Sequence, residues 1–116
     1  MPSFAAVTIY AFGISAFSHG VASLVWQKDA LAKKKLAAPS LPALNSFSVV
    51  IIGIGIYYCL AAYQENRAFF AMTLARFISA KIFWSQGPAW RTIATWEALS
   101  AAVTSIALVW DLLGEA

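Results

Sequence analysis

Residues 44–63 of this chain read LNSFSVVIIGIGIYYCLAAY, a run without a single Asp, Glu, Lys or Arg. A helix of about 20 apolar residues crosses the roughly 30 Å hydrocarbon core of a bilayer. Three more apolar stretches surround this one along the chain, at residues 4–26, 68–84 and 92–113. The sequence therefore predicts an all-α fold, an integral membrane bundle of four helices.

The overall composition also favours a membrane environment over water. Apolar residue types make up 61% of the 116 residues and charged types only 11%, whereas soluble domains carry about 25% charged residues. The four stretches are apolar almost all round, so no water-facing side can be assigned to them. We expect one membrane domain over residues 1–116, with sequential helices as antiparallel neighbours because most of their connections are short.

The longest connection, residues 27–43, holds most of the positive charge. It contains Lys28, Lys33, Lys34 and Lys35, and Arg91 falls in the third connection, which faces the same side. The positive-inside rule places this loop in the cytoplasm and both termini in the lumen or outside the cell. In a eukaryote we would expect the endoplasmic reticulum. The net charge of +3 is therefore not a signal for nucleic-acid binding: the basic residues either set the topology alone or also contact anionic lipid headgroups.

Four ionisable side chains inside the apolar stretches require an explanation, because charges are costly in lipid. With a rise of about 1.5 Å per residue, His19, Lys81 and Glu97 fall at similar depths in the cytoplasmic half, and Arg76 falls nearer the middle. Polar side chains on membrane helices tend to face other helices. We therefore expect His19, Lys81 and Glu97 to converge inside the bundle.

Such a trio could exchange protons with an apolar ligand, because one group can donate a proton while another accepts one. His19, Lys81 and Glu97 are accordingly the candidate catalytic residues of a non-redox isomerase or cyclase. The structural alternative is that Lys81 extends to the headgroups, Glu97 pairs with it, and His19 bonds a carbonyl. Candidate ligand contacts are Arg76 and residues on the same helix faces as the trio: Ser15, Ser100, Thr104, Phe77 and Trp84.

Arg76 has three open interpretations. It could pair with Glu65, Asp111 or backbone carbonyls, it could bind an anionic ligand group such as a carboxylate, or it could be hidden against another subunit. The sequence does not choose among them.

Metal and cofactor sites are not expected. One cysteine, Cys59, excludes an internal disulfide and a CxxC redox pair. One histidine and no paired cysteines cannot complete a zinc site, and a haem would lack a second ligand.

The order of features resembles the small four-helix membrane proteins grouped as DoxX-like. The resemblance rests on GVASLVW at 20–26, the proline-bearing loop, the glycines of the second helix, the short polar turn, and IFWSQGP at 82–88. It implies a four-helix membrane fold. The layout is also similar to the ergosterol-pathway scaffold subunit, which would imply a protein that gathers enzymes, and, more faintly, to the trimeric membrane glutathione transferases.

The leading hypothesis is a small membrane protein that binds an apolar metabolite, such as a terpenoid, sterol or polyketide-like lipid. If it is an enzyme, it would isomerise or cyclise that compound by acid/base chemistry. The alternative is a scaffold without chemistry that recruits biosynthetic enzymes. Because one small bundle encloses little space, we expect a homo-oligomer or a larger membrane enzyme as partner, besides membrane lipids.

Overall fold

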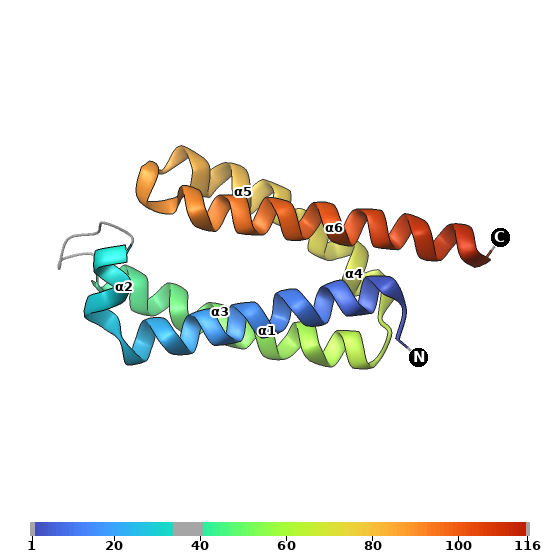
Figure 1. Ribbon diagram of the computed structural model, residues 1–116, viewed down its shortest axis with the longest axis horizontal. Helices are drawn as coiled ribbons and strands as arrows, with labels where there is room; N and C mark the ends of the chain where they lie inside the picture. The colour runs from blue at the N-terminus through green and yellow to red at the C-terminus, as the bar shows by residue number, and fades with distance from the viewer. Residues whose placement is uncertain (1, 34–40, 116) are drawn as a thin grey trace.

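The computed structural model describes residues 2–33 and 41–115, and in these residues helices are joined by turns with no strand (Figure 1). The long helices are α1 (Phe4–Val25), α3 (Leu41–Tyr63) and α6 (Arg91–Glu115). The shorter elements are α2 (Gln27–Lys33), α4 (Arg67–Met72), η2 (Thr73–Ala75), α5 (Arg76–Ser85) and η3 (Pro88–Trp90). The prediction of an all-helical chain is confirmed.

Three helical segments are long and apolar enough to cross a membrane, judged by length and composition: Phe4–Val25, Leu41–Tyr63 and Pro88–Glu115. They correspond to the predicted stretches 4–26, 44–63 and 92–113. Helix α3 begins three residues earlier than predicted, and Pro42 is tolerated there because the first turn of a helix needs no N–H donor. The predicted loop 27–43 begins as helix α2, while Lys34, Lys35 and Pro39 lie outside the described residues.

The remaining apolar stretch, residues 68–84, differs from the single helix that its hydropathy predicts. It is divided into α4, the 3₁₀ turn η2 and α5. The hydroxyl of Thr73 donates to the carbonyl of Phe70 at 2.6 Å, and Arg76 Nε donates to the carbonyl of Thr73 at 3.0 Å. Side chains that bond nearby backbone carbonyls bend helices at that point. Helix α5 keeps only ten residues, about 15 Å of rise.

The helices are arranged as two antiparallel pairs (Figure 1). Helix α1 packs along α3, α5 packs along α6, and contacts between α1 and α6 join the pairs. The short helix α4 crosses from the end of α3 towards the second pair, and both termini lie at the same end of the molecule (Figure 1). The backbones of α3 and α5, both fully described, barely approach each other. One side of the interior is therefore closed by side chains instead of by backbone packing.

Glycines set the distance between α1 and α3. A Cβ placed on Gly55 would lie 2.5 Å from the carbonyl oxygen of Gly13, and one on Gly20 would lie 2.6 Å from that of Ser48. Small residues of this kind allow two helix backbones to approach closely. The α1–α3 pair is consequently the most closely packed part of the fold.

Acidic side chains fasten the end of the molecule that holds the termini. Asp111 on α6 accepts hydrogen bonds from the backbone N–H groups of Phe4 and Ala5, at 3.2 and 2.9 Å. Glu65 accepts from the backbone and the hydroxyl of Ser3, at 2.8 and 2.7 Å. Two free donors of the first turn of α1 are thus satisfied by a residue far away in the sequence, while the N–H of Ala6 donates to the neighbouring Ser3 hydroxyl.

Arg67 and Glu115 form an exposed ion pair at the same end. The hydrogen bond from Arg67 to Glu115 is the main cause of a raised pKa for that guanidinium. Since the pair is exposed, its contribution to stability is small.

Candidate functional site

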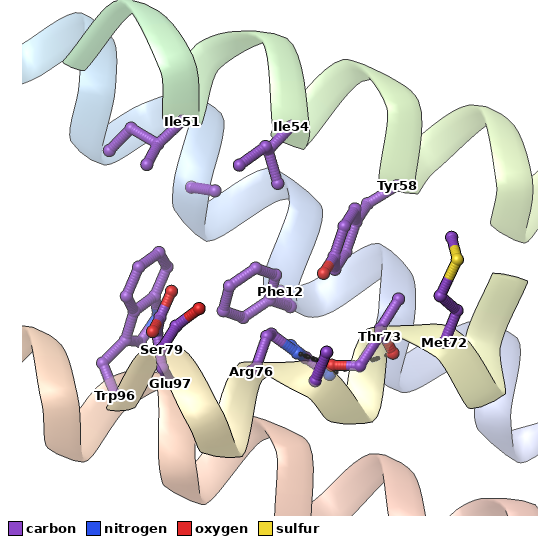
Figure 2. A pocket seen from close by; sticks show the side chains of 12 residues that line it. Phe12, Ile51, Ile54, Tyr58, Met72, Thr73, Arg76, Ser79, Trp96 and Glu97 are labelled. Atoms are coloured by element: carbon purple, nitrogen blue, oxygen red, sulfur yellow. Dashed lines mark hydrogen bonds between the residues drawn. The ribbon is translucent and has the colours of Figure 1, made fainter. Parts of the chain in front are cut away.

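A cavity of ≈190 Å³ lies between the two helix pairs, and side chains from α1, α3, α4, η2, α5 and α6 line it (Figure 2). Its lining combines aliphatic, aromatic and polar side chains: Phe12, Ala16, Ile51, Ile54, Tyr58, Met72, Thr73, Ala75, Arg76, Ser79, Trp96 and Glu97. In Figure 2, Trp96, Glu97 and Ser79 lie towards one end of the cavity, and Thr73 and Met72 lie towards the other.

Arg76 is the central polar group of this site, and only 5% of it is exposed. Its Nε donates to the Thr73 carbonyl at 3.0 Å, and its Nη2 lies 3.2 Å from the Thr104 hydroxyl and 3.5 Å from that of Thr73. The guanidinium carbon is 4.1 Å from the centroid of the Phe12 ring and 5.4 Å from that of Tyr58. Cation–π contacts of this kind stabilise a cation removed from water. The sequence leaves three interpretations of Arg76 open. The bond to the Thr73 carbonyl corresponds to the first of them, in which the guanidinium pairs with groups of the same chain such as backbone carbonyls.

Thr104 extends this network to the first helix. Its buried hydroxyl lies 2.9 Å from that of Thr8, which also donates to the carbonyl of Ala5 at 2.7 Å. The result is a chain of hydrogen bonds from Arg76 through two threonines to the backbone of α1. These bonds fix the position of the guanidinium between the helix pairs.

Two residues that line the cavity each have a buried polar atom without a hydrogen-bond partner among the described residues: Nη1 of Arg76 and Oε2 of Glu97. The two side chains form no ion pair within 4.0 Å in the described part of the chain, where Arg67–Glu115 is the ion pair found. A buried polar group without a partner is costly and rare in native proteins. The cavity therefore presents one donor and one acceptor that an occupant could satisfy.

Trp96 forms a wall of the site next to Glu97. Its ring stacks on Phe12 with 4.5 Å between centroids, and its Nε1 donates to the hydroxyl of Ser15 at 3.1 Å. That hydroxyl also donates to the Phe12 carbonyl at 2.7 Å. Ser15, a predicted ligand contact, thus orients the indole and is not part of the lining.

The predicted catalytic residues occupy different surroundings. Glu97 lines the cavity together with Arg76. The half-buried His19 places its ring 6.1 Å from that of Trp96 and 6.4 Å from that of Phe47. Lys81 is exposed on α5 and is not among the lining residues. Of the three side chains expected to converge, only Glu97 is therefore among the residues that line the cavity. The catalytic roles of all three stay predictions.

The remaining predicted ligand contacts also divide. Thr104 holds Arg76, and the Ser100 hydroxyl donates to the carbonyl of Trp96 at 2.5 Å. Phe77 and Trp84 are 44% and 52% exposed, and Arg91 lies over the Trp84 ring at 4.8 Å. Phe77 and Trp84 lie outside the cavity lining. Their exposed rings are therefore placed to contact molecules around the protein, not a ligand inside the cavity.

Several lining residues were not singled out from the sequence, among them Phe12, Tyr58, Thr73 and Trp96. The aromatic residues give no signal inside an apolar stretch, where rings are ordinary core or lipid-facing groups. Thr73 could have been found, because it precedes Arg76 by three positions and such neighbours share a helix face.

Among the described residues, no three His, Cys, Asp or Glu side chains are grouped so that they could hold a metal ion. A scan against protein-family models, a search of curated proteins and a search of solved structures found no match for this chain.

Proposed function

We propose that this chain is an integral membrane protein that binds a lipid-soluble metabolite in the cavity beside Arg76 and Glu97. The observation that carries the proposal is that Arg76 and Glu97, which line one small cavity, each hold a buried polar atom without a hydrogen-bond partner among the described residues. Inside a bilayer such groups mark functional sites, because water is not available to satisfy them.

The exterior of the helices supports insertion in a membrane. Of the most apolar windows of α1, α3 and the Pro88–Glu115 segment, 39%, 28% and 28% are buried, so most of each window faces outward. In this proposal α4, η2 and α5 form a fourth, broken crossing, which completes an antiparallel bundle. Broken crossings are tolerated where neighbouring helices satisfy the freed backbone groups. The basic helix α2 lies on the cytoplasmic side and both termini lie opposite, following the positive-inside rule.

Acid/base rearrangement of the bound compound is the second part of the proposal. Glu97 would exchange a proton with the ligand and Arg76 would orient its polar end. His19 and Lys81, which the sequence predicts as catalytic residues together with Glu97, lie outside the lining and would take part in the same proton transfer. The DoxX-like resemblance and a homo-oligomeric assembly belong to the same proposal.

Filling the cavity tests the binding function. Ser79 lines the cavity and the adjacent Ile78 is 66% exposed, so Ser79→Phe and Ile78→Phe add the same ring inside and outside the site. We expect wild type and Ile78→Phe to co-purify with a lipid-soluble compound, and Ser79→Phe to lose it. The measurement is mass spectrometry of organic extracts of the purified proteins.

Equal retention by the two variants, with both folded by circular dichroism, would refute a ligand in this cavity. A stoichiometric protein partner with no bound compound in wild type would favour the scaffold. Once the compound is identified, Glu97→Gln is expected to abolish its conversion in membranes, and full turnover would limit the protein to binding.

A further inference from the structure

The hydrogen bonds of Arg76 determine how it can contact a ligand. A guanidinium has five N–H donors, and here Nε and Nη2 are directed to Thr73 and Thr104. Nη1 has no partner in the described part of the chain. Carboxylates and phosphates bind arginine most strongly through two parallel hydrogen bonds. The two N–H groups that remain both belong to Nη1, so Arg76 is not arranged for the paired contact that a carboxylate makes with two different nitrogens of a guanidinium.

Glu97 restricts the charge of the ligand. It lines the same cavity as Arg76, and its buried Oε2 lacks a partner among the described residues. An anionic ligand would bring a second negative group next to this carboxyl, and like charges repel strongly at a site removed from water. A hydroxyl group, in contrast, can donate a hydrogen bond to Oε2.

The size and walls of the cavity indicate which part of a ligand it can hold. Its volume of ≈190 Å³ is below the roughly 300–1,000 Å³ of ordinary small-molecule sites. Phe12, Tyr58 and Trp96 give it flat aromatic walls. The backbones of α3 and α5 are not in close contact, so an apolar remainder of the molecule would have to displace only the side chains that close this side of the interior. The cavity thus fits a polar end group whose tail lies among lipids or side chains.

From these constraints we infer that the ligand ends in an uncharged hydroxy-carbonyl group. Its carbonyl oxygen accepts from Nη1 of Arg76 and its hydroxyl donates to Oε2 of Glu97. This inference rests on the proposed binding function and names the chemical class of the compound that the site takes.

Four probes built on the same twelve-carbon chain test the inference: 1-hydroxy-2-dodecanone, its methyl ether, 2-dodecanone and dodecanoate. Each is titrated at equal mole fraction into the full chain in lipid nanodiscs, and bound probe is counted by native mass spectrometry. We expect the hydroxyketone to bind about tenfold more tightly than the ether or the ketone, the size of effect that one hydrogen bond to a charged group produces. Dodecanoate should bind least.

Three variants assign the preference to the site. Glu97→Leu should bind the hydroxyketone and its ether equally, whereas Glu97→Gln keeps an acceptor oxygen and should retain most of the difference. Asp29→Leu removes an exposed carboxylate of α2 and should behave as wild type. Circular dichroism of each variant verifies its helix content.

The outcomes separate this inference from the proposed function. Equal binding of all four probes, or tightest binding of dodecanoate, would overturn the hydroxy-carbonyl inference and leave a lipid-binding cavity. A preference that persists in Glu97→Leu would also overturn it. If no probe binds and the extracts of the purified protein contain no compound, the proposed function fails as well.

Discussion

At the scale of single residues, a buried arginine organises the interior of this protein. Arg76 is surrounded by aromatic rings and held by threonine hydroxyls and a carbonyl oxygen, with no carboxylate within ion-pair distance in the described part of the chain. Such a position is tolerable only if its hydrogen bonds are made, because an arginine inside the membrane has few other ways to lower its free energy.

Replacing Thr104 by valine tests the importance of that network. Thr104→Val keeps the shape of the side chain but removes the hydroxyl that contacts both Arg76 and Thr8. We expect a loss of about 1.5–3 kcal/mol in the free energy of unfolding, the usual value for a hydrogen bond to a charged group. Unfolding of the purified protein by SDS in mixed micelles provides the measurement.

Thr95→Val is the matched control. The Thr95 hydroxyl is exposed and donates to the carbonyl of Arg91 in its own helix, so its removal should change stability by less than about 0.5 kcal/mol. Equal losses in the two variants would show that the network around Arg76 adds nothing to stability.

Residue chemistry also explains how much of the site can be predicted from the sequence. Arg76 and Glu97 stand out because a charge within an apolar stretch requires a reason. Lys81 was grouped with Glu97 by estimated depth, but depth does not say towards which neighbour a side chain points. Phe12 and Trp96 become site residues only because α1 packs against α6, and the sequence around each residue does not indicate this packing.

At the scale of the elements, hydropathy predicts the long helices and misses a break. The ends of α1, α3 and α6 fall within a few residues of the predicted stretches. The division at η2 arises from side-chain contacts of Thr73 and Arg76 with the backbone, and average hydropathy contains no information about them. The break turns the start of α5 inward and thereby places Arg76 at the cavity.

The close packing of α1 on α3 gives a prediction at this scale. Gly55→Ala would place a methyl group 2.5 Å from the Gly13 carbonyl oxygen, so the two helices would have to separate. Overpacking of this kind costs about 1–3 kcal/mol. We expect the SDS midpoint of unfolding to fall accordingly.

Gly53→Ala serves as comparison on the same helix. A Cβ at Gly53 meets no atom within 4 Å, and alanine favours helix over glycine by about 1 kcal/mol. This variant should be as stable as wild type or more stable. If Gly55→Ala is also neutral, the close approach of the two helices is not required for stability.

At the scale of the whole molecule, the fold is elongated, with extents of 53 × 26 × 17 Å, and its two ends differ in charge. Helix α2 and Arg91, the first residue of α6, lie at one end, and the acidic residues Glu65, Asp111 and Glu115 lie at the other together with Arg67 (Figure 1). This asymmetry is what the proposed membrane orientation requires.

Labelling of single cysteines tests the orientation. In a Cys59→Ala background, Lys28→Cys and Gln64→Cys place a thiol at opposite ends of the molecule. In sealed vesicles with the cytoplasmic side outward, a membrane-impermeant maleimide should modify the thiol at position 28 and reach that at 64 only after detergent is added. Modification of both thiols without detergent would contradict a membrane-spanning chain.

The bonds from Phe4 and Ala5 to Asp111 join positions 107 and 106 residues apart. During synthesis the ribosome completes the opening helix long before it reaches the carboxylate that caps it. A nascent chain therefore carries these two N–H groups without their carboxylate until residue 111 has been added.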